Sequence, residues 1–517
     1  MGNGDASRNV PMSRSIDWPI LIISIIVVAI VSVLIVFFPE SSAQRINHAF
    51  SVTTQSLGRV YILAGFLTMF ALLILGIGPW RKIKLGSEEE SPSYSTFAWA
   101  GMLFSTGIGT AVLYWGTIEW IDYFLSPPFG IEAKSTEAHQ WAMSYGMFHW
   151  GILGWAFYAL PAACLSYAYH VRGSANPSLA EACAPILKGA TQRWPGRTIN
   201  ALFMIGLIGS ASTGLGLTTP LITESFRAFF EFEPSFAFTI ASILLLVGLI
   251  ALSVSLGLDR GIKRLSTINL ALMLVLLALI YFMGPTKAIT EQGIDSIRFM
   301  ISHFALMSGI RYPESNKAFT EAWTVFYWAW WISFAPFVGM FICKISRGRT
   351  LGQLIWGVIL FGTMGCTLCF IIFGGYGSYL EFEGKQPIID TFSENRHAAV
   401  VYVVCSLPLG KWILPLFFLL CISFAATTYD SASYTLALSA TKSIGFNDEP
   451  ARWHRVLWAV TLGILPLALL SIGKQSEVLV ALQTASVVVS VPMLFISLLM
   501  TVSLVIGIRR QQAESRS

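Results

Sequence analysis

Apolar stretches long enough to cross a lipid bilayer recur along the whole 517-residue chain. A membrane-spanning helix needs about 20 apolar residues, and the first such stretch runs from Trp18 to Phe38. The sequence predicts twelve spans, near residues 18–38, 57–79, 97–124, 140–170, 196–229, 235–257, 262–284, 320–345, 352–379, 411–442, 453–472 and 482–508. Only 12% of the residues are charged, too few to cover a soluble protein of this size. The spans are apolar on all sides rather than at every second residue, which excludes a membrane β-barrel. We therefore expect an all-α membrane protein.

Lysine and arginine are concentrated in alternate linkers between these spans. The basic linkers are 81–84, 172–197, 260–264, 344–349, 442–455 and 509–510, whereas 126–137 and 381–394 are poor in basic residues. Because cytoplasmic loops are enriched in lysine and arginine, this pattern predicts a multi-pass protein with an even number of spans and both termini in the cytoplasm. The net charge of +5 lies at helix ends, so no nucleic-acid partner is indicated.

One segment between spans mixes charged and apolar residues. From Thr290 to Ile310, acidic and basic side chains alternate with isoleucine, phenylalanine and methionine. This pattern predicts either an amphipathic helix in the membrane interface or a loop helix packed on the protein.

The third expected span contains two closely spaced glycines, Gly107 and Gly109. Glycine weakens a helix and permits unwinding. In transporters, a broken helix can present its carbonyl groups to a cation near the middle of the bilayer. Small residues also allow close helix packing, and the glycines alone favour neither interpretation.

Aromatic residues are dense in the fourth and eighth spans. The fourth contains Phe148-His-Trp150 and Trp155-Ala-Phe-Tyr158, and the eighth contains a run from Trp323 to Phe334. Tryptophan and tyrosine usually anchor helices at the membrane interface, but Trp331 falls near the middle of its span. A quaternary ammonium group has no N–H to donate, and aromatic cages bind it by cation–π attraction of about 0.5–2 kcal/mol per ring. The sequence thus predicts an onium-binding cage.

Two adjacent hydroxyl residues, Thr427 and Thr428, precede Asp430 in the tenth span. An aspartate within a span is costly and marks a functional candidate. The hydroxyls are suited to a small hard cation such as Na⁺. Taken alone, however, the pair is better explained by hydroxyls that bond back to their own helix.

Together these stretches resemble the betaine/carnitine/choline transporter (BCCT) family over nearly the whole chain. The most specific match is Trp323–Thr350, and Phe148–Trp155 and Gly261–Ser266 agree as well. The resemblance implies twelve helices with a LeuT-type inverted repeat of two five-helix units, preceded by two extra helices, and a homotrimer. The implied division is a cytoplasmic tail at 1–17, two peripheral helices and a loop at 18–96, the first repeat at 97–284, a periplasmic amphipathic region at 285–319, the second repeat at 320–508 and a short cytoplasmic tail at 509–517.

The resemblance also implies site residues. The aromatic box falls on Trp150, Trp155, Tyr158 and Trp331, and Trp330 and Phe334 would line the path toward the cytoplasm. Phe334 is a departure, because many members have tryptophan there. The sodium site would use the carbonyls of Ser105, Ile108 and Phe424 and the hydroxyls of Thr427 and Thr428.

The coupling ion and the solute are less sharply indicated. The sodium-independent carnitine exchangers of the family lack the hydroxyl pair and place methionine and arginine where this chain has Val338 and Lys263. Sodium-coupled symport is therefore favoured, with Na⁺-independent exchange as the alternative. Glu119 without a following proline is similar to the carnitine exchangers, and nearby Asp122 would either attract a cationic head group or cap the span. A carnitine-like or betaine-like zwitterion is the first expected solute and choline the second. A third possibility keeps the family but changes the solute, for example to ectoine or dimethylsulfoniopropionate.

Other classes of function find less support. An enzyme would need histidines, cysteines or carboxylates at ligand or nucleophile spacing, and the sequence has no HExxH motif. Cys366 and Cys369 form a CxxC, but it lies in an apolar span without a second pair. A channel usually repeats a pore motif or assembles short subunits. We expect no enzyme activity, no catalytic metal and no organic cofactor, with Na⁺ as the coupling ion.

Overall fold

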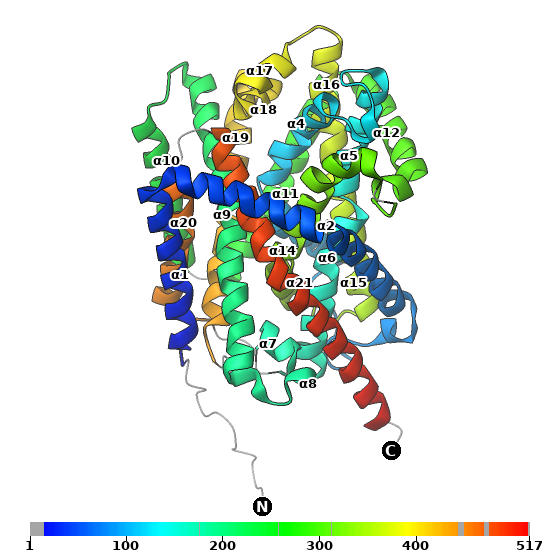
Figure 1. Cartoon of the computed structure of the whole chain (residues 1–517), viewed down its shortest axis with the longest axis vertical. Coiled ribbons are helices and arrows are strands. Elements are labelled where there is room, and N and C mark those ends of the chain that lie inside the picture. The colour runs from blue at the N-terminus through cyan, green and yellow to red at the C-terminus, as the bar shows by residue number, and fades with distance from the viewer. Residues whose placement is uncertain are drawn as a thin grey trace, which may run out of the picture.

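The computed structural model describes residues 15–174, 176–256, 258–311, 313–442, 449–469 and 475–514. Within these ranges it describes the backbone but not the side chains of 105–108, 212–213, 256–264 and 475–482. The part described is helical, apart from two isolated β-bridges. α1 begins and α21 ends at the same end of the molecule, whereas α16, α17 and α18 lie at the opposite end (Figure 1). This arrangement is consistent with an even number of spans.

In the described part of the chain, eight long helices run without interruption. They are α1 (Trp18–Phe37), α2 (Pro39–Ile77), α9 (Trp194–Phe230), α10 (Phe236–Leu256), α11 (Leu258–Met283), α19 (Gly410–Ser439), α20 (Arg452–Leu469) and α21 (Gln475–Glu514).

Four further spans are interrupted. They consist of α3 (Thr96–Ile108) with α4 (Ala111–Leu125); α5 (Thr136–His149) with α6 (Ile152–Ser166) and the π-helix η3 (Tyr167–Val171); α13 (Lys317–Phe319) with the π-helix η6 (Thr320–Val325) and α14 (Phe326–Ile345); and α15 (Leu351–Cys369) with the π-helix η7 (Phe370–Gly374) and α16 (Gly375–Phe382). Shorter helices complete the described chain: η1 (Pro79–Lys82), η2 (Pro128–Gly130), α7 (Leu179–Ala182), α8 (Ala184–Leu187), η4 (Ala190–Gln192), α12 (Thr286–Met307), η5 (Glu314–Asn316), α17 (Ile388–Glu394) and α18 (Arg396–Cys405).

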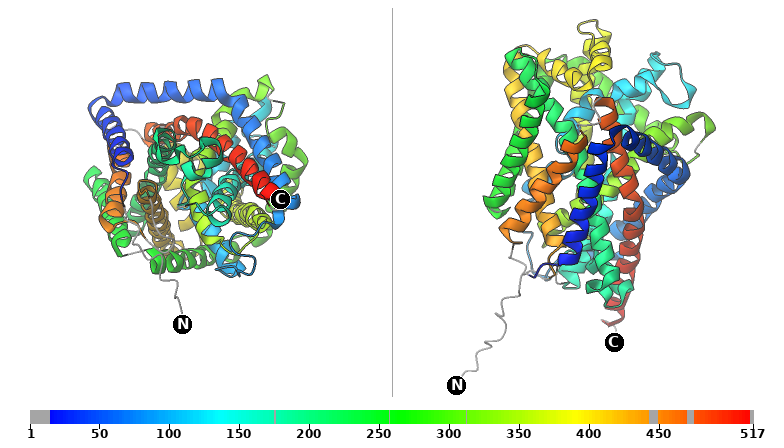
Figure 2. Two further views of the ribbon diagram at one scale, coloured as in Figure 1. Left: turned by 90° about the horizontal axis from the view of Figure 1, so that it is seen from below. Right: turned by 60° about the vertical axis from the view of Figure 1, so that its left-hand side comes forward.

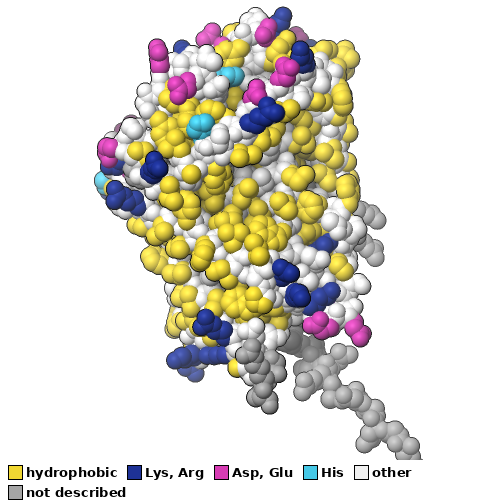
Figure 3. Space-filling view, turned by 90° about the vertical axis from the view of Figure 1, so that its right-hand side faces the viewer, with side chains coloured by type: hydrophobic (Ala, Val, Ile, Leu, Met, Phe, Trp, Pro, Cys, Tyr) yellow, Lys and Arg dark blue, Asp and Glu magenta, His cyan; other side chains and the backbone are white. Residues whose placement is uncertain are grey.

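The prediction of an all-α membrane protein is confirmed. Among the described residues, ten helical segments are long and apolar enough to cross a membrane. The broken pair α3–α4 and the helix α20 occupy the two remaining predicted positions. Large apolar side chains are exposed over the outer surface, including Leu63, Leu67 and Phe70 on α2. In Figure 3 such side chains form a band between regions that carry most of the charged residues of that face. A lipid environment accounts for this band, because a soluble protein rarely exposes so large a continuous apolar surface to water.

Two spans are longer than the sequence predicts. The second was expected at 57–79, but α2 begins at Pro39, a favoured first position of a helix. The last helix continues to Glu514, beyond the expected end at 508. Hydropathy detects only the apolar part of a helix, and both extensions are polar. α2 runs along the outside of the molecule beside α1 and α21 (Figure 2).

The segment expected at 290–310 is helical and forms α12. Its buried face includes Ile289, Gly293 and Ser296, and it packs against α5, where the Ser144 hydroxyl donates to the Ser296 carbonyl at 3.1 Å. Ile301 on the same helix is exposed. The helix is therefore packed on the protein, and its place in the membrane interface stays a prediction.

Two breaks in the helices place the candidate site. α3 ends at Ile108, and Gly109 has φ +50°, ψ −146°, a conformation that favours glycine. The fourth span, expected to be continuous, is broken between His149 and Ile152. A Cβ atom at Gly151 would lie 2.6 Å from the Met147 carbonyl oxygen, so the chain can make this break only with glycine there. Trp150 thereby lies at the junction of α5 and α6, while α14 packs closely against α6.

Candidate functional site

A cavity lies between the break in α3–α4 and the helices α6, α9, α14 and α19. Its lining is aromatic on one side and hydroxyl-bearing on the other. The lining residues are Gly109, Thr110, Ala111, Trp150, Tyr158, Ser210, Gly214, Thr218, Trp330, Trp331, Phe334, Ala425, Thr428 and Tyr429. Interiors with mostly apolar walls and a few polar groups are typical of sites for small molecules.

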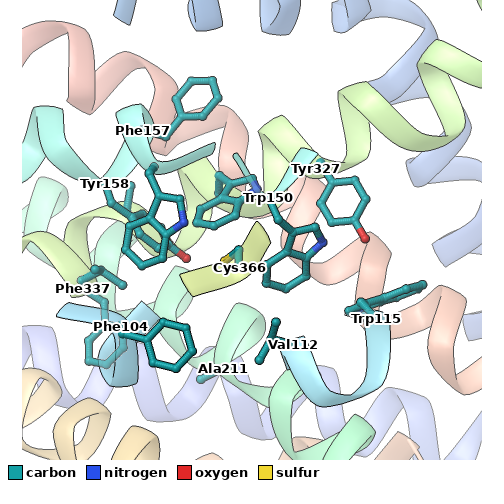
Figure 4. Close-up of a cluster of buried hydrophobic side chains, with 14 of the residues drawn as sticks. Phe104, Val112, Trp115, Trp150, Phe157, Tyr158, Ala211, Tyr327, Phe337 and Cys366 are labelled. Atoms are coloured by element: carbon teal, nitrogen blue, oxygen red, sulfur yellow. The ribbon is translucent and has the colours of Figure 1, made fainter. Parts of the chain in front are cut away.

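The four residues of the implied aromatic box lie together. The ring centroid of Trp331 is 4.6 Å from that of Tyr158, 5.7 Å from that of Trp150 and 5.8 Å from that of Trp155. Trp155 and Tyr158 are 5.5 Å apart and nearly perpendicular. Figure 4 shows Trp150 and Tyr158 in this cluster, close to Cys366. Rings at such distances and angles present faces and edges to a common space rather than stacking in parallel.

Trp155 differs from the other three because it does not line the cavity. It is fully buried against α15, where its ring covers Gly362. A Cβ atom at Gly362 would lie only 2.0 Å from Cδ2 of Trp155. Trp155 therefore supports Trp331 and Tyr158 from behind.

Trp330 and Phe334 both line the cavity. The Trp330 ring lies 5.7 Å from Trp150 and perpendicular to it. The Phe334 ring packs against Phe337 at 5.3 Å. Their role along a path to the cytoplasm stays a prediction.

The implied sodium site is split between two faces of α19. The Thr428 hydroxyl lines the cavity and is buried, and it has no hydrogen-bond partner among the residues that the structure describes. It lies 3.1 Å from the position a Cβ would take at Gly109, where α3 ends. A helix that ends at Ile108 leaves its last four carbonyl groups, those of Ser105 to Ile108, without partners inside the helix. The side chains of Ser105 and Ile108 lie outside the described residues. Phe424 is buried one turn before Thr428.

Thr427 faces α11 rather than the cavity. Its hydroxyl donates to the Ser423 carbonyl at 2.8 Å and accepts from Asn269 Nδ2 at 2.8 Å. The bond from the Thr427 hydroxyl to the Ser423 carbonyl is a bond back to its own helix, which is the interpretation that the sequence favoured for the hydroxyl pair taken alone. One lone pair of the Thr427 oxygen remains, so its role as a cation ligand stays a prediction. Asp430 also faces away, because its Oδ2 accepts from Ser253 of α10 at 3.1 Å.

A fully buried carboxylate, Glu119, lies directly behind the aromatic box, and sequence reasoning gave it no role. It accepts hydrogen bonds from Trp150 Nε1 at 3.0 Å, from the Tyr327 hydroxyl at 2.7 Å and from the Tyr123 hydroxyl. His149 Nδ1 lies 2.9 Å from the Tyr123 oxygen. The signal that would have found Glu119 is the same one that singled out Asp430: an acidic residue in the middle of an apolar span.

Asp122 is engaged by an arginine. Arg396 of α18 binds it bidentately, at 2.7 Å and 2.9 Å. Its charge is thereby neutralised by a partner distant in sequence, and whether Asp122 attracts a cationic head group or caps the span stays a prediction. Val338 is fully buried in α14, and the Lys263 side chain lies outside the described residues. Cys366 and Cys369 are buried free thiols.

Comparison with known proteins agrees with this architecture. A family model described as "BCCT, betaine/carnitine/choline family transporter" matches residues 19–513. An uncharacterized transporter, YeaV, of Escherichia coli strain K12 is 33% identical over 84% of this chain and 89% of its own. A carnitine transporter of Acinetobacter baumannii is 31% identical over 88% of this chain and 82% of its own. A glycine betaine transporter of Acinetobacter baylyi is 31% identical over 95% of this chain and 73% of its own. The chain therefore belongs to the betaine/carnitine/choline transporter family, and it is a multi-pass membrane transporter rather than an enzyme.

Proposed function

We propose that this transporter carries compact quaternary-ammonium zwitterions, carnitine-like or betaine-like, through the cavity beside α14. The observation that supports this most directly is the convergence of Trp150, Tyr158 and Trp331 on one space, with Trp155 behind them. A quaternary ammonium group has no N–H to donate, so aromatic faces are its best partners. The similarity to a carnitine transporter and a glycine betaine transporter supports the same solute class.

We further propose that uptake is coupled to Na⁺. The cation would be held by the carbonyls of Ser105, Ile108 and Phe424 and by the hydroxyls of Thr428 and Thr427. The buried Thr428 hydroxyl beside the end of α3 supports this assignment. The carbonyl end of a helix carries partial negative charge, and a hard cation prefers oxygen ligands. No organic cofactor is proposed.

Transport would follow alternating access, in which the repeats at 97–284 and 320–508 move against each other around the cavity. The two repeats would each contribute one side of the site, since Trp150, Trp155 and Tyr158 come from the first and Trp331 from the second. We place the protein in the bacterial inner membrane with both termini in the cytoplasm, as a homotrimer. The basic linkers and the common end of α1 and α21 support this orientation.

The test is uptake by the purified protein in liposomes. Labelled carnitine, glycine betaine and choline are offered with and without an inward Na⁺ gradient, and Trp331→Leu is measured beside the wild type. We expect Na⁺-driven accumulation of a zwitterion, reduced at least tenfold in Trp331→Leu. Na⁺-independent exchange against internal solute would instead identify an exchanger. Absence of uptake of every quaternary ammonium would refute the proposed function.

A further inference from the structure

Glu119 lies where two helices and a helix break meet at the aromatic box. It belongs to α4, and its three donors come from α4 itself, from α14 and from the junction of α5 and α6. Tyr327 precedes Trp331 by one helical turn, so both lie on the same face of α14. The carboxylate thus bonds directly to Trp150, a residue of the box. It also bonds to Tyr327, which lies one turn before Trp331 of the box.

The surrounding hydrogen bonds suit an ionised carboxylate. Tryptophan Nε1 can only donate, and the two tyrosine hydroxyls each have one proton to give. If His149 carries its proton on Nδ1, it donates to the Tyr123 oxygen, and its Nε2 accepts from the Thr324 hydroxyl at 3.0 Å. Every hydrogen bond in this series, from Thr324 through His149 and Tyr123, is then donated in the direction of Glu119. His149 Nδ1 is 3.9 Å from the carboxylate, and Asp122, one turn along α4, already has Arg396 as its partner.

A negative charge buried in this way acts on the cage in two respects. An N–H bond to a charged acceptor is stronger and better aligned than one to a neutral acceptor, so it restricts the Trp150 ring. The charge also lies in a medium of low dielectric constant, where attraction to a cation in the cavity is screened far less than in water. The first effect holds the cage in shape for any ligand that fits it, and the second favours a cationic group over an uncharged group of the same shape.

We propose, on the basis of the proposed function, that Glu119 is a positioning and specificity-determining residue of the transport site. Its carboxylate holds the Trp150 indole in the aromatic box and supplies the negative charge that selects an onium group, without touching the substrate. The rings of the cage accept either a cationic or an apolar group. Selectivity for a positive charge would therefore come from Glu119 and not from the rings.

The geometry provides a variant that removes the charge and keeps the hydrogen bonds. In Glu119→Gln, the amide oxygen can accept from Trp150 and Tyr327, while the amide nitrogen donates to the Tyr123 oxygen. Tyr123 can then donate to His149 Nδ1, and His149 Nε2–H can donate to the Thr324 hydroxyl. The direction of donation in the whole series of hydrogen bonds reverses, and no heavy atom has to move. Glu119→Asp is the complementary variant, because it keeps the charge but is one methylene too short to reach every donor.

The experiment measures binding of glycine betaine or carnitine, whichever the wild type transports, and of its isostere in which carbon replaces the quaternary nitrogen. Dissociation constants are obtained calorimetrically for wild type, Glu119→Gln, Glu119→Asp and Tyr123→Phe. We expect Glu119→Gln to weaken onium binding about tenfold, equivalent to about 1.4 kcal/mol, and to change isostere binding less than twofold. Tyr123→Phe retains both the charge and the Trp150 bond and should keep the wild-type ratio of the two constants.

Glu119→Asp should weaken both ligands and preserve their ratio, which keeps the proposal testable if Glu119→Gln does not fold. A ratio in Glu119→Gln equal to that of the wild type, or a ratio lost in Glu119→Asp, overturns the assignment of Glu119 while leaving the transport function intact. A wild type that binds and transports no quaternary ammonium overturns the proposed function, and this inference with it.

Discussion

Substituting alanine for Gly362 should damage the site through Trp155 rather than through the substrate. The added Cβ would lie 2.0, 2.2 and 2.3 Å from three atoms of the Trp155 ring, whereas carbon atoms ordinarily meet at about 3.5–4.0 Å. The ring or the helix α15 must therefore move by roughly 1.5 Å. Trp155 lies against Tyr158 and Trp331, so a displaced ring enters the space of the cage.

The expected losses of stability and of binding are similar in size, and they are measured separately. Overpacking of a core costs about 1–3 kcal/mol, but replacing glycine by alanine inside a helix contributes about 1 kcal/mol in the other direction. Unfolding should thus become easier by about 0–2 kcal/mol. Each ring displaced from a desolvated cation costs about 0.5–2 kcal/mol, which corresponds to a roughly 2–30-fold rise in the dissociation constant.

Calorimetric binding and thermal unfolding of the purified protein separate the two effects. Gly116→Ala is the matched control, because the nearest atom to its Cβ would be 3.8 Å away, an ordinary contact, and it lies in a similarly buried helix. We expect wild-type affinity in Gly116→Ala. Wild-type affinity in Gly362→Ala as well would refute the view that Trp155 supports the cage from behind.

Two further predictions follow from the same geometry. Thr428→Ala should reduce the Na⁺ dependence of uptake more than Thr427→Ala does, because only Thr428 lines the cavity; Thr427→Ala should instead lower thermal stability, by about 1–2 kcal/mol for the buried bonds it loses. Equal effects of the two variants on Na⁺ dependence would contradict this division. Asp122→Asn should lower thermal stability by leaving Arg396 half-buried without its counter-charge, and exchanging the two residues should restore much of it. An unchanged melting temperature in the single variant would show that the pair contributes nothing.

Much of the architecture follows from the sequence through simple physical constraints. Backbone groups in lipid must find partners within their own helix, so a long apolar run has few alternatives to a spanning helix. The polar beginning of α2 and the end of α21 escaped detection, since hydropathy carries no information about a helix that continues outside the apolar layer. The break at Trp150 was missed for a related reason, because Phe148–Trp155 remains apolar across it.

The residues of the aromatic box were implied by the family resemblance. The sequence pattern alone indicated an aromatic cage, because tryptophans deep in a span do not serve as interface anchors. Their relative depth was not predictable. That Trp155 lies behind the cage depends on Gly362 in α15, more than 200 residues away in sequence.

The different surroundings of Thr427 and Thr428 were decided only by tertiary contacts. Thr427 and Thr428 are neighbours in sequence and equivalent as hydroxyls, yet Asn269 of α11 occupies one and the break in α3 faces the other. Successive residues of a helix point about 100° apart, so a sequence pair is divided as soon as different helices pack on the two sides.

The buried acids show the same dependence on distant partners. Asp122 could be assigned to a ligand from the sequence, but Arg396 neutralises it, whereas Glu119 accepts hydrogen bonds from Tyr327 and Trp150 beside the cage. The cost of burying a carboxylate was evident from its place in an apolar span; what offsets that cost depends on which helices pack around it. The sequence by itself therefore determined which residues had to be inside the membrane, and the tertiary structure decided which of them remain available to a solute.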